Sequence, residues 1–425
     1  MKLTKLEKSW ILYDIANSAF ILLVATLLPI YFDYLAAADG LSSADYLSYW
    51  GYAGSVATVL VAVIGPICGT LADQRGFKKR LFVISMIVGV AGCAALGVAW
   101  GWLSFLVIFV IAKVGYSASI VFYDSMLPEI TTNERMDRVS TLGYALGYIG
   151  SVLPFAVCLV VVLCYESIGI SQVTALIISF IITAVWWLVC SLPIVKRYQQ
   201  SAYRTTTGNP VAETFRQLYK SFREARKQKH IFVYLVAFFF FIDGVYTIID
   251  MATAYGKSLG LDTTGLLLAL LVTQIVAFPC SIIFGRFSAK YDTGLLIKIC
   301  ILCYTGIAVF AIFLASQWQF WVLAVLVGMF QGGIQALSRS YLGKIIPPER
   351  SGEYFGLMDI CGKGASFVGT TLVATVSQVT EGMTFSVFGL PVANTGVAVG
   401  SIAVLFVIGY VLFCVADKMN KTRMA

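Results

Sequence analysis

Several ionisable and amide side chains lie inside long apolar stretches of this 425-residue sequence. A charged side chain at the centre of a membrane-spanning helix costs about 2.5–3.5 kcal/mol on insertion scales, so each one needs a partner or a function. Groups of these types can carry protons or hydrogen-bond a polar solute. The candidates are Asp14, Asn17, Lys113, Asp124, Asp243, Gln331, Gln335, Asp359 and Lys363.

Asp243 is the strongest candidate of this set. It lies about halfway along the apolar stretch 231–256, with no cation within one turn on its own segment. Burial of a carboxylate favours its protonated form, which is the property that a proton carrier needs. We therefore expect Asp243 to bind and release protons, assisted by Asp14. Lys113, Lys363 and the two glutamines would orient a small polar solute.

Helical spacing places other candidates on shared faces. Asp14 and Asn17 are three residues apart, and the eleven residues from Lys113 to Asp124 are close to three full turns. Because Asp124 lies near a helix end, capping or gating is the alternative to contact with a solute.

Arg339 and the pair of Asp359 and Lys363 each allow two interpretations. Arg339 follows Gln331 and Gln335 at helical spacing and lies near a helix end, so it either gates or contacts a solute. Asp359 and Lys363 form an i, i+4 pair in the favoured acid-first order. They either serve the site or neutralise each other and serve only packing.

The composition shows what kind of elements must hold these residues. The chain is 59% apolar and 12% charged, whereas about 25% of the residues of a soluble protein are charged. Runs of about 20 apolar residues are candidates for membrane spans, and within lipid a helix pairs all of its own backbone groups. We predict an all-α integral membrane protein with twelve transmembrane helices, at 10–35, 48–72, 81–100, 103–126, 139–164, 171–193, 231–256, 262–285, 295–315, 318–341, 353–378 and 395–416.

The basic residues predict the orientation of these helices. All but three of the 30 Lys and Arg residues lie in or beside alternate connecting segments, which are cytoplasmic if the N-terminus is inside. Lys257 is expected outside, and Lys113 and Lys363 lie within predicted spans. Both termini are then cytoplasmic. A nucleic-acid partner is not expected, because the basic residues do not gather in a soluble domain.

The polar segment 194–230 divides the chain into two predicted six-helix bundles, 1–193 and 231–425. An amphipathic basic helix lying on the inner leaflet is predicted within this linker, with a regulatory docking site as the alternative. Its apolar residues recur at helical spacing at Phe215, Leu218, Tyr219 and Phe222.

Residues 69–80, GTLADQRGFKKR, form a tight basic turn between two predicted spans. A weak copy, GRFSAKYDTG, follows 216 residues later at 285–294. In the copy, Ala289 stands where the acid is expected, and the acid Asp292 comes later. The two halves are therefore expected to be related but not equivalent.

GTLADQRGFKKR resembles the signature of the major facilitator superfamily, G-x-L-A-D-x-x-G-[RK]-[RK]-x, although Phe77 stands where a basic residue is usual. Three further segments resemble the UMF1 family, which includes the autophagy-related vacuolar amino-acid effluxers of fungi and many bacterial members. They are YDIANSAF (13–20), FFIDGVYTII (240–249) and QGGIQALSRSYLGKIIPPERSGEYFGLMDICGKGAS (331–366).

This resemblance implies secondary transport by two bundles that rock about a cavity lined by spans 1, 4, 7 and 10, with a contribution from span 11. It also implies that Asp73 holds the N-terminus of a helix of the opposite half when the carrier opens outward. We expect a cytoplasmic gate formed by Gly69, Asp73, Gly76, Lys78, Lys79, Arg80 and Arg339.

These observations predict an alternating-access carrier of a small polar solute, either proton-coupled or facilitative, with amino acids suggested by the fungal relatives. Membrane lipids are further expected partners, and we expect a monomer in a bacterial cytoplasmic membrane without cofactor or metal. A carrier of amphiphiles such as lipids or drugs is one alternative, and a receptor or scaffold without turnover is another. An enzyme is not expected, because His230 is the only histidine and no nucleophile–His pair is plausible.

Overall fold

The computed structural model describes residues 2–41, 43–205, 214–217, 228–380, 383, 385–387 and 390–424. Most of the predicted amphipathic linker helix lies outside these ranges, and residues 214–217 within it are helical. The described chain divides into two compact units. Unit 1 comprises Met1–Thr132, Leu146–Leu218 and Pro347–Gly356, and unit 2 comprises Asn133–Ala145, Tyr219–Ile346 and Leu357–Ala425.

Two helix ends belong to a unit that their position in the sequence would not suggest. The start of α6 (Asn133–Leu163), within 133–145, belongs to unit 2, and the start of α14 (Ser351–Val379), within 347–356, belongs to unit 1. Two clusters of charged residues described below lie at these two helix ends.

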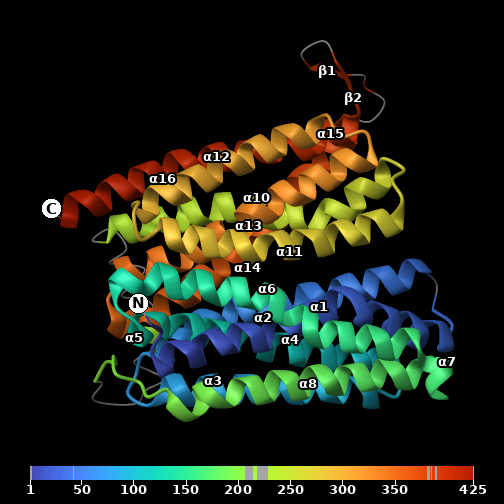
Figure 1. Ribbon diagram of the computed structural model, residues 1–425, viewed down its shortest axis with the longest axis horizontal. Coiled ribbons are helices and arrows are strands. Elements are labelled where there is room, and N and C mark those ends of the chain that lie inside the picture. The colour runs from blue at the N-terminus through green and yellow to red at the C-terminus, as the bar shows by residue number, and fades with distance from the viewer. Residues whose placement is uncertain are drawn as a thin grey trace. The chain divides into compact units, whose positions relative to one another are not determined.

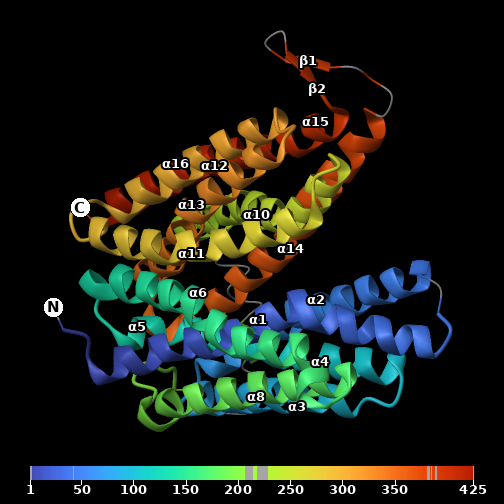
Figure 2. The same ribbon diagram turned by 45° about the vertical axis from the view of Figure 1, so that its right-hand side comes forward.

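The named elements of unit 1 in the part that the structure describes are all helices. In this unit α1 (Lys5–Ala38) packs against α8 (Gln172–Arg197), and α2 (Ser43–Ala72) packs against α4 (Trp102–Ser125). Helix α3 (Phe77–Ala95) packs against both α4 and α8, as Figure 2 shows for α3 and α8. Its elements are α1 (Lys5–Ala38), α2 (Ser43–Ala72), α3 (Phe77–Ala95), η1 (Leu96–Val98), α4 (Trp102–Ser125), α5 (Leu127–Ile130), most of α6 (Asn133–Leu163), α7 (Tyr165–Ile168), α8 (Gln172–Arg197) and η2 (Pro348–Arg350).

Unit 2 adds a small hairpin to its helices. In it α10 packs against α16, α11 against α13, and α12 against both α13 and α16 (Figure 1). Its elements are α10 (Lys229–Ser258), α11 (Thr263–Phe287), α12 (Thr293–Ile312), α13 (Gln317–Ile345), most of α14 (Ser351–Val379), β1 (Phe385–Val387), β2 (Leu390–Val392), α15 (Asn394–Gly400) and α16 (Ile402–Met424).

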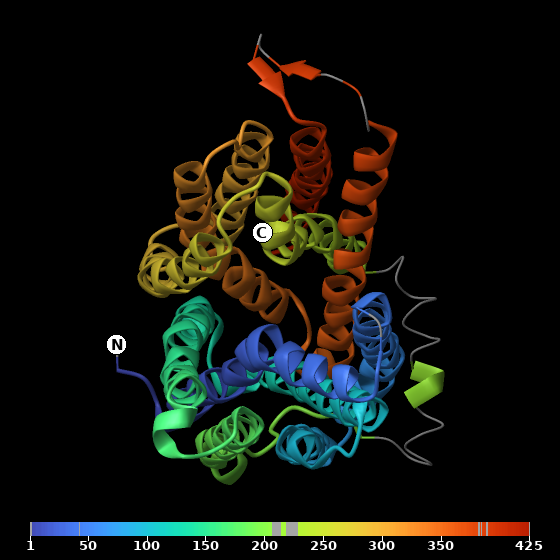
Figure 3. The same cartoon turned by 90° about the vertical axis from the view of Figure 1, so that its right-hand side faces the viewer.

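The hairpin corrects the prediction of an all-helical chain in one detail. Strands β1 and β2 are antiparallel, with Phe385 opposite Val392, and they extend beyond the helices of unit 2 (Figure 3).

Eleven helices in the described part of the chain are long and apolar enough to cross a membrane. Helix α14 adds a shorter apolar stretch, Val368–Val379. Exposed apolar side chains recur on these helices at helical spacing, as at Leu153, Val157 and Val160 on α6. Such a face suits contact with lipid, so the protein is a multi-pass membrane protein.

Candidate functional site

The turn between α2 and α3 places the carboxylate of Asp73. Gly76 begins α3 with φ +78°, a left-handed conformation that glycine adopts at low cost. Gly69 is required for space instead, because a Cβ there would overlap the carbonyl oxygen of Gly352. These two glycines let the turn approach the first residues of α14 closely within unit 1.

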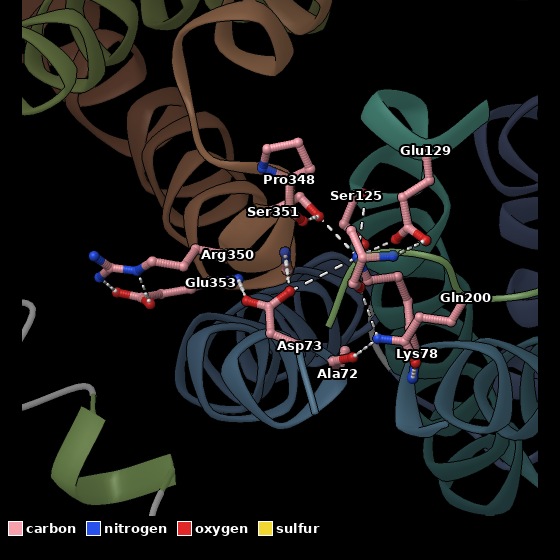
Figure 4. Close-up of polar contacts among 12 residues, drawn as sticks. Ala72, Asp73, Lys78, Ser125, Glu129, Gln200, Pro348, Arg350, Ser351 and Glu353 are labelled. Atoms are coloured by element: carbon pink, nitrogen blue, oxygen red, sulfur yellow. Dashed lines mark hydrogen bonds and ion pairs between the residues drawn. The ribbon is translucent and has the colours of Figure 1, made fainter. Parts of the chain in front are cut away.

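Asp73 caps the N-terminus of α14 (Figure 4). Its Oδ1 accepts a hydrogen bond from the backbone N–H of Gly352 at 2.7 Å, and its Oδ2 accepts one from Glu353 at 2.9 Å. The first N–H groups of a helix have no partner within the helix and form the positive end of its dipole. A buried carboxylate therefore binds well there.

Lys78 lies between two carboxylates and is fully buried. Its Nζ donates to Glu129 Oε1 at 2.7 Å and to Ser351 Oγ at 2.7 Å, and it lies 3.7 Å from Asp73 Oδ1 (Figure 4). The ammonium group thus offsets the charge of two acids that are removed from water. We refer to Asp73, Lys78, Glu129, Ser351, Gly352 and Glu353 as the Asp73 cluster.

The Asp73 cluster is expected to respond to pH. Burial raises the pKa of Asp73 to about 7, against the opposing effects of Lys78 and the two backbone donors. If α14 is released and Asp73 meets water, its pKa returns to near 3.9. The cluster with the raised pKa binds protons more tightly, so acid favours the formed contact, and the contact weakens as the pH rises through about 7.

Hydrogen exchange of the Gly352 and Glu353 amides, corrected for intrinsic rates, tests this expectation between pH 5 and 8. Protection should fall as the pH rises in the natural protein and should be independent of pH in Asp73→Asn. Protection that increases with pH would contradict the assignment.

A second cluster of buried charges lies in unit 2. Asp137, near the start of α6, accepts hydrogen bonds from Ser340 Oγ, Thr293 Oγ1 and Lys344 Nζ, each at 2.6 Å. We refer to Asp137, Thr293, Ser340 and Lys344 as the Asp137 cluster. Its acid lies on α6 itself and accepts from side chains, whereas Asp73 lies outside α14 and accepts from backbone groups of that helix.

Arg339 contacts α6 in unit 2, one helical turn from Asp137. Its Nε and Nη2 donate to Ser140 Oγ at 2.9 Å and to the Ser140 carbonyl at 3.0 Å. Its guanidinium carbon lies 4.4 Å from the centre of the Tyr144 ring. The predicted gate residues are therefore divided between the two units.

The weak copy of the basic turn has a different role from the original. Asp292 caps its own helix, α12, by accepting from Leu295 N at 3.2 Å, and it pairs with Lys421 at 2.9 Å. Asp137, which pairs with Lys344, is one of the buried acids of this unit. The copy retains close packing, because a Cβ at Gly285 would overlap Thr141 Oγ1 of α6.

Asp243 is fully buried in unit 2, between α10 and α14. Its Oδ1 accepts from the backbone N–H of Gly369 at 2.9 Å and from Thr247 Oγ1 at 3.2 Å. Its Oδ2 is buried and has no hydrogen bond within the described part of the chain. One carboxylate oxygen is thus fixed, while the other is available for a proton.

Asp14 and Asn17 are buried on α1 in unit 1. The Asn17 amide donates to the Tyr13 carbonyl, and Ser18 Oγ donates to the Asp14 carbonyl. On α4, the Nζ of Lys113 lies 5.6 Å from the centre of the Phe109 ring. This unit therefore carries an acid and a cation within its spans.

The remaining predicted residues differ in their surroundings. Gln331 is buried, and its Oε1 has no hydrogen bond among the described residues. The partly buried residues are Asp124, Gln335, Asp359 and Lys79, and Arg80 is exposed. The Lys363 side chain lies outside the described residues.

Four residues of these clusters are not among the predicted site residues: Glu129, Asp137, Ser351 and Lys344. All four lie in short polar segments between spans, where charges ordinarily face water. The only signal was that matched acidic segments, MLPEITTNER and IIPPERSGE, follow the fourth and tenth predicted spans.

Comparison with known proteins identifies the family. A family model described as vacuole effluxer Atg22 like matches residues 4–136 and 130–423. The MFS-type transporter YxiO of Bacillus subtilis is 38% identical over 99% of this chain and 97% of its own length. Autophagy-related protein 22-1 of Aspergillus fumigatus is 25% identical, over 57% of this chain and 43% of its own length.

Solved structures show the same fold at low identity. A bacterial homologue of the iron transporter ferroportin, in an outward-facing state, has a TM-score of 0.73 and 12% identity over 97% of this chain and 99% of its own. The transporter FucP, in the outward conformation, has a TM-score of 0.71 and 14% identity, with 97% of each chain covered. These relatives are transporters and not enzymes. The chain therefore belongs to the Atg22-like family of the major facilitator superfamily and is a membrane transporter.

Proposed function

We propose that this transporter is a secondary carrier that couples the movement of a small polar solute to protons, with Asp243 as the titrating group. Membership of the family supports transport. The proton coupling is carried by one observation, the half-satisfied carboxylate of Asp243. Its Oδ1 is held by two donors, and its buried Oδ2 has no hydrogen bond within the described residues.

Protonation of Asp243 would change how α10 and α14 contact each other. Hydrogen bonds to an ionised acceptor are about twice as strong as bonds between neutral groups. A proton on Oδ2 therefore weakens the bond from Gly369 N to Oδ1. Protonation of Asp243 is linked in this way to the packing of α14 against α10. Coupling of proton binding to a conformational change requires such a link.

The solute is proposed to be small and polar, and amino acids are the first candidates. The resemblance to the fungal effluxers suggests this class. Asp14 and Lys113, both within unit 1, supply groups of opposite charge for the two ends of a zwitterion. Gln331 supplies an uncharged buried acceptor in unit 2.

The Asp73 cluster is proposed to act as a cytoplasmic gate. It would hold the first turn of α14 in one state of the cycle and release it in another. Figure 4 shows the contacts that such a release would break, from Asp73 to Gly352 and Glu353 and from Lys78 to Ser351.

Transport in proteoliposomes tests the role of Asp243. A thermal-shift screen against the twenty amino acids would first identify a bound solute, because a ligand that binds only the folded state raises apparent stability. An imposed pH gradient should then drive accumulation of that solute. Asp243→Asn is expected to reduce this accumulation at least tenfold while solute counterflow continues.

Asp250→Asn is the matched control, because it makes the same change at an exposed position of the same helix. It is expected to accumulate solute like the natural protein. Full gradient-driven accumulation in Asp243→Asn would disprove the assignment.

A further inference from the structure

Residues 198–204, which follow α8 directly, lie against the turn between α2 and α3 within unit 1. We refer to this segment as the strap. Gln200 makes the central contacts: its Oε1 accepts from Gly76 N at 2.9 Å and from Lys78 N at 3.4 Å, and its Nε2 donates to the Ala72 carbonyl at 3.0 Å (Figure 4). The Gln200 side chain, from a distant part of the sequence, therefore forms hydrogen bonds with backbone groups on both sides of the turn.

These contacts supply what the turn itself lacks. Gly76 is the N-cap residue of α3 and has no side chain that could accept from the first N–H groups of that helix. The last carbonyls of α2 likewise lack partners within their own helix. Gln200 serves as a cap for both helices.

Glu129 anchors the strap. Its Oε2 accepts from Ser201 N at 2.6 Å, from Ala202 N at 3.1 Å and from Ser201 Oγ at 3.1 Å. Its Oε1 accepts from Tyr198 Oη at 3.0 Å and from Lys78 Nζ at 2.7 Å. The same carboxylate thus holds both the strap and the buried cation of the Asp73 cluster.

The backbone of the strap also contacts the residue that carries the acid. Arg204 N donates to the Asp73 carbonyl at 2.7 Å, and Arg204 forms a parallel bridge with Gln74. Beside this bridge, the guanidinium carbon of Arg75 lies 5.5 Å from the centre of the Tyr203 ring. The strap therefore fixes the main chain at Asp73 itself, whereas its named hydrogen bonds do not involve α14.

We propose that the strap is a positioning element of the Asp73 cluster, with Gln200 and Glu129 as its positioning residues. The strap sets the turn so that the Asp73 carboxylate meets the N–H groups of Gly352 and Glu353. Loss of the strap would release the start of α14 although no residue of α14 is changed. The proposal does not depend on proton coupling or on the identity of the solute.

The alternative is that the strap only covers the turn. In that case its loss would expose residues 72–78 to water and would leave the cap on α14 intact. The two readings differ in what happens at Gly352 and Glu353.

Hydrogen–deuterium exchange of the full-length protein in detergent micelles separates the two readings without any solute. Gln200→Met keeps the length of the side chain and removes its hydrogen bonds. We expect the amides of Gly352 and Glu353 to exchange at least fivefold faster in this variant. Gln199→Met is the matched control, because Gln199 is the exposed neighbour, and it should leave exchange unchanged.

A double variant tests whether the strap acts through Asp73. In Gln200→Met combined with Asp73→Asn, exchange at Gly352 should be no faster than in Asp73→Asn alone, because both changes break the same contact. Additive effects would overturn the proposal. Faster exchange confined to residues 72–78 would also overturn it, as would an equal rise in peptides from α13, which reports general destabilisation.

Discussion

Replacement of Lys78 by Met should lower the free energy of unfolding by about 3–5 kcal/mol at neutral pH, which is the usual cost of removing one partner from a buried ion pair. The reason is that Asp73 and Glu129 would both remain buried without the ammonium group between them. Equilibrium unfolding in detergent micelles measures the change. Acidification should restore part of the loss, because protonation removes the uncompensated charge.

The neighbouring residue provides a control for this prediction. Lys79→Met makes the same chemical change on a partly exposed side chain and should alter stability by less than about 0.5 kcal/mol. Adding Glu129→Gln to Lys78→Met should recover only part of the stability, since it removes one of the two uncompensated charges but weakens the hydrogen bonds that Glu129 accepts from Ser201 and Ala202. Equal effects of Lys78→Met and Lys79→Met would show that the buried pair contributes nothing.

The fold could be predicted from the sequence because membrane helices are encoded locally. Each span needs about 20 apolar residues, and basic residues mark its cytoplasmic end. Eleven of the described helices are long and apolar enough to be such spans. The hairpin of β1 and β2 could not be predicted in the same way, because three-residue strands carry too few side chains to show a period.

The candidate site could be predicted only where local spacing or a motif reports it. Thr247 lies one helical turn from Asp243, and the hydrogen bond between them follows from that spacing. The hydrogen bond from the Gly369 amide to Asp243 could not be predicted, because a backbone amide has no signature in the sequence. Asp73 was identified through the motif, and the motif names neither Glu129 nor Gln200.

Contacts between segments far apart in the sequence account for what was missed. Asp137 and Lys344 are 207 residues apart, and each looks like an ordinary charge in a short polar loop. Burial turns them into a pair, and burial of a helix end is a tertiary property. The weak copy of the basic turn shows the converse, because its Asp292 resembles Asp73 in sequence but caps its own helix.

Substitution of Gly369 by Ala should abolish proton-coupled accumulation as completely as Asp243→Asn does. A Cβ at Gly369 would overlap Thr247 Oγ1 and would lie 2.6 Å from Asp243 Oδ1, closer than real Cβ contacts come. Either the carboxylate or α14 must then move, and the bond from Gly369 N to Oδ1 is lost. Overpacking of this kind also costs about 1–3 kcal/mol of stability.

Gly362 offers a matched control on the same helix. A Cβ there would meet Tyr246 Cε2 at 3.6 Å and Phe238 Cε1 at 3.8 Å, which are ordinary contacts. Gly362→Ala should therefore keep accumulation near the natural level and should raise the free energy of unfolding by about 0.5–1 kcal/mol, because alanine loses less backbone entropy in a helix than glycine does.

If Gly369→Ala and Gly362→Ala both accumulated solute normally, the close approach of α14 to Asp243 would have no part in coupling. If both failed, bending of α14 at its glycines would account for the loss better than the carboxylate does. If only Gly369→Ala failed to accumulate solute, coupling would depend on the contact between the Gly369 amide and the Asp243 carboxylate.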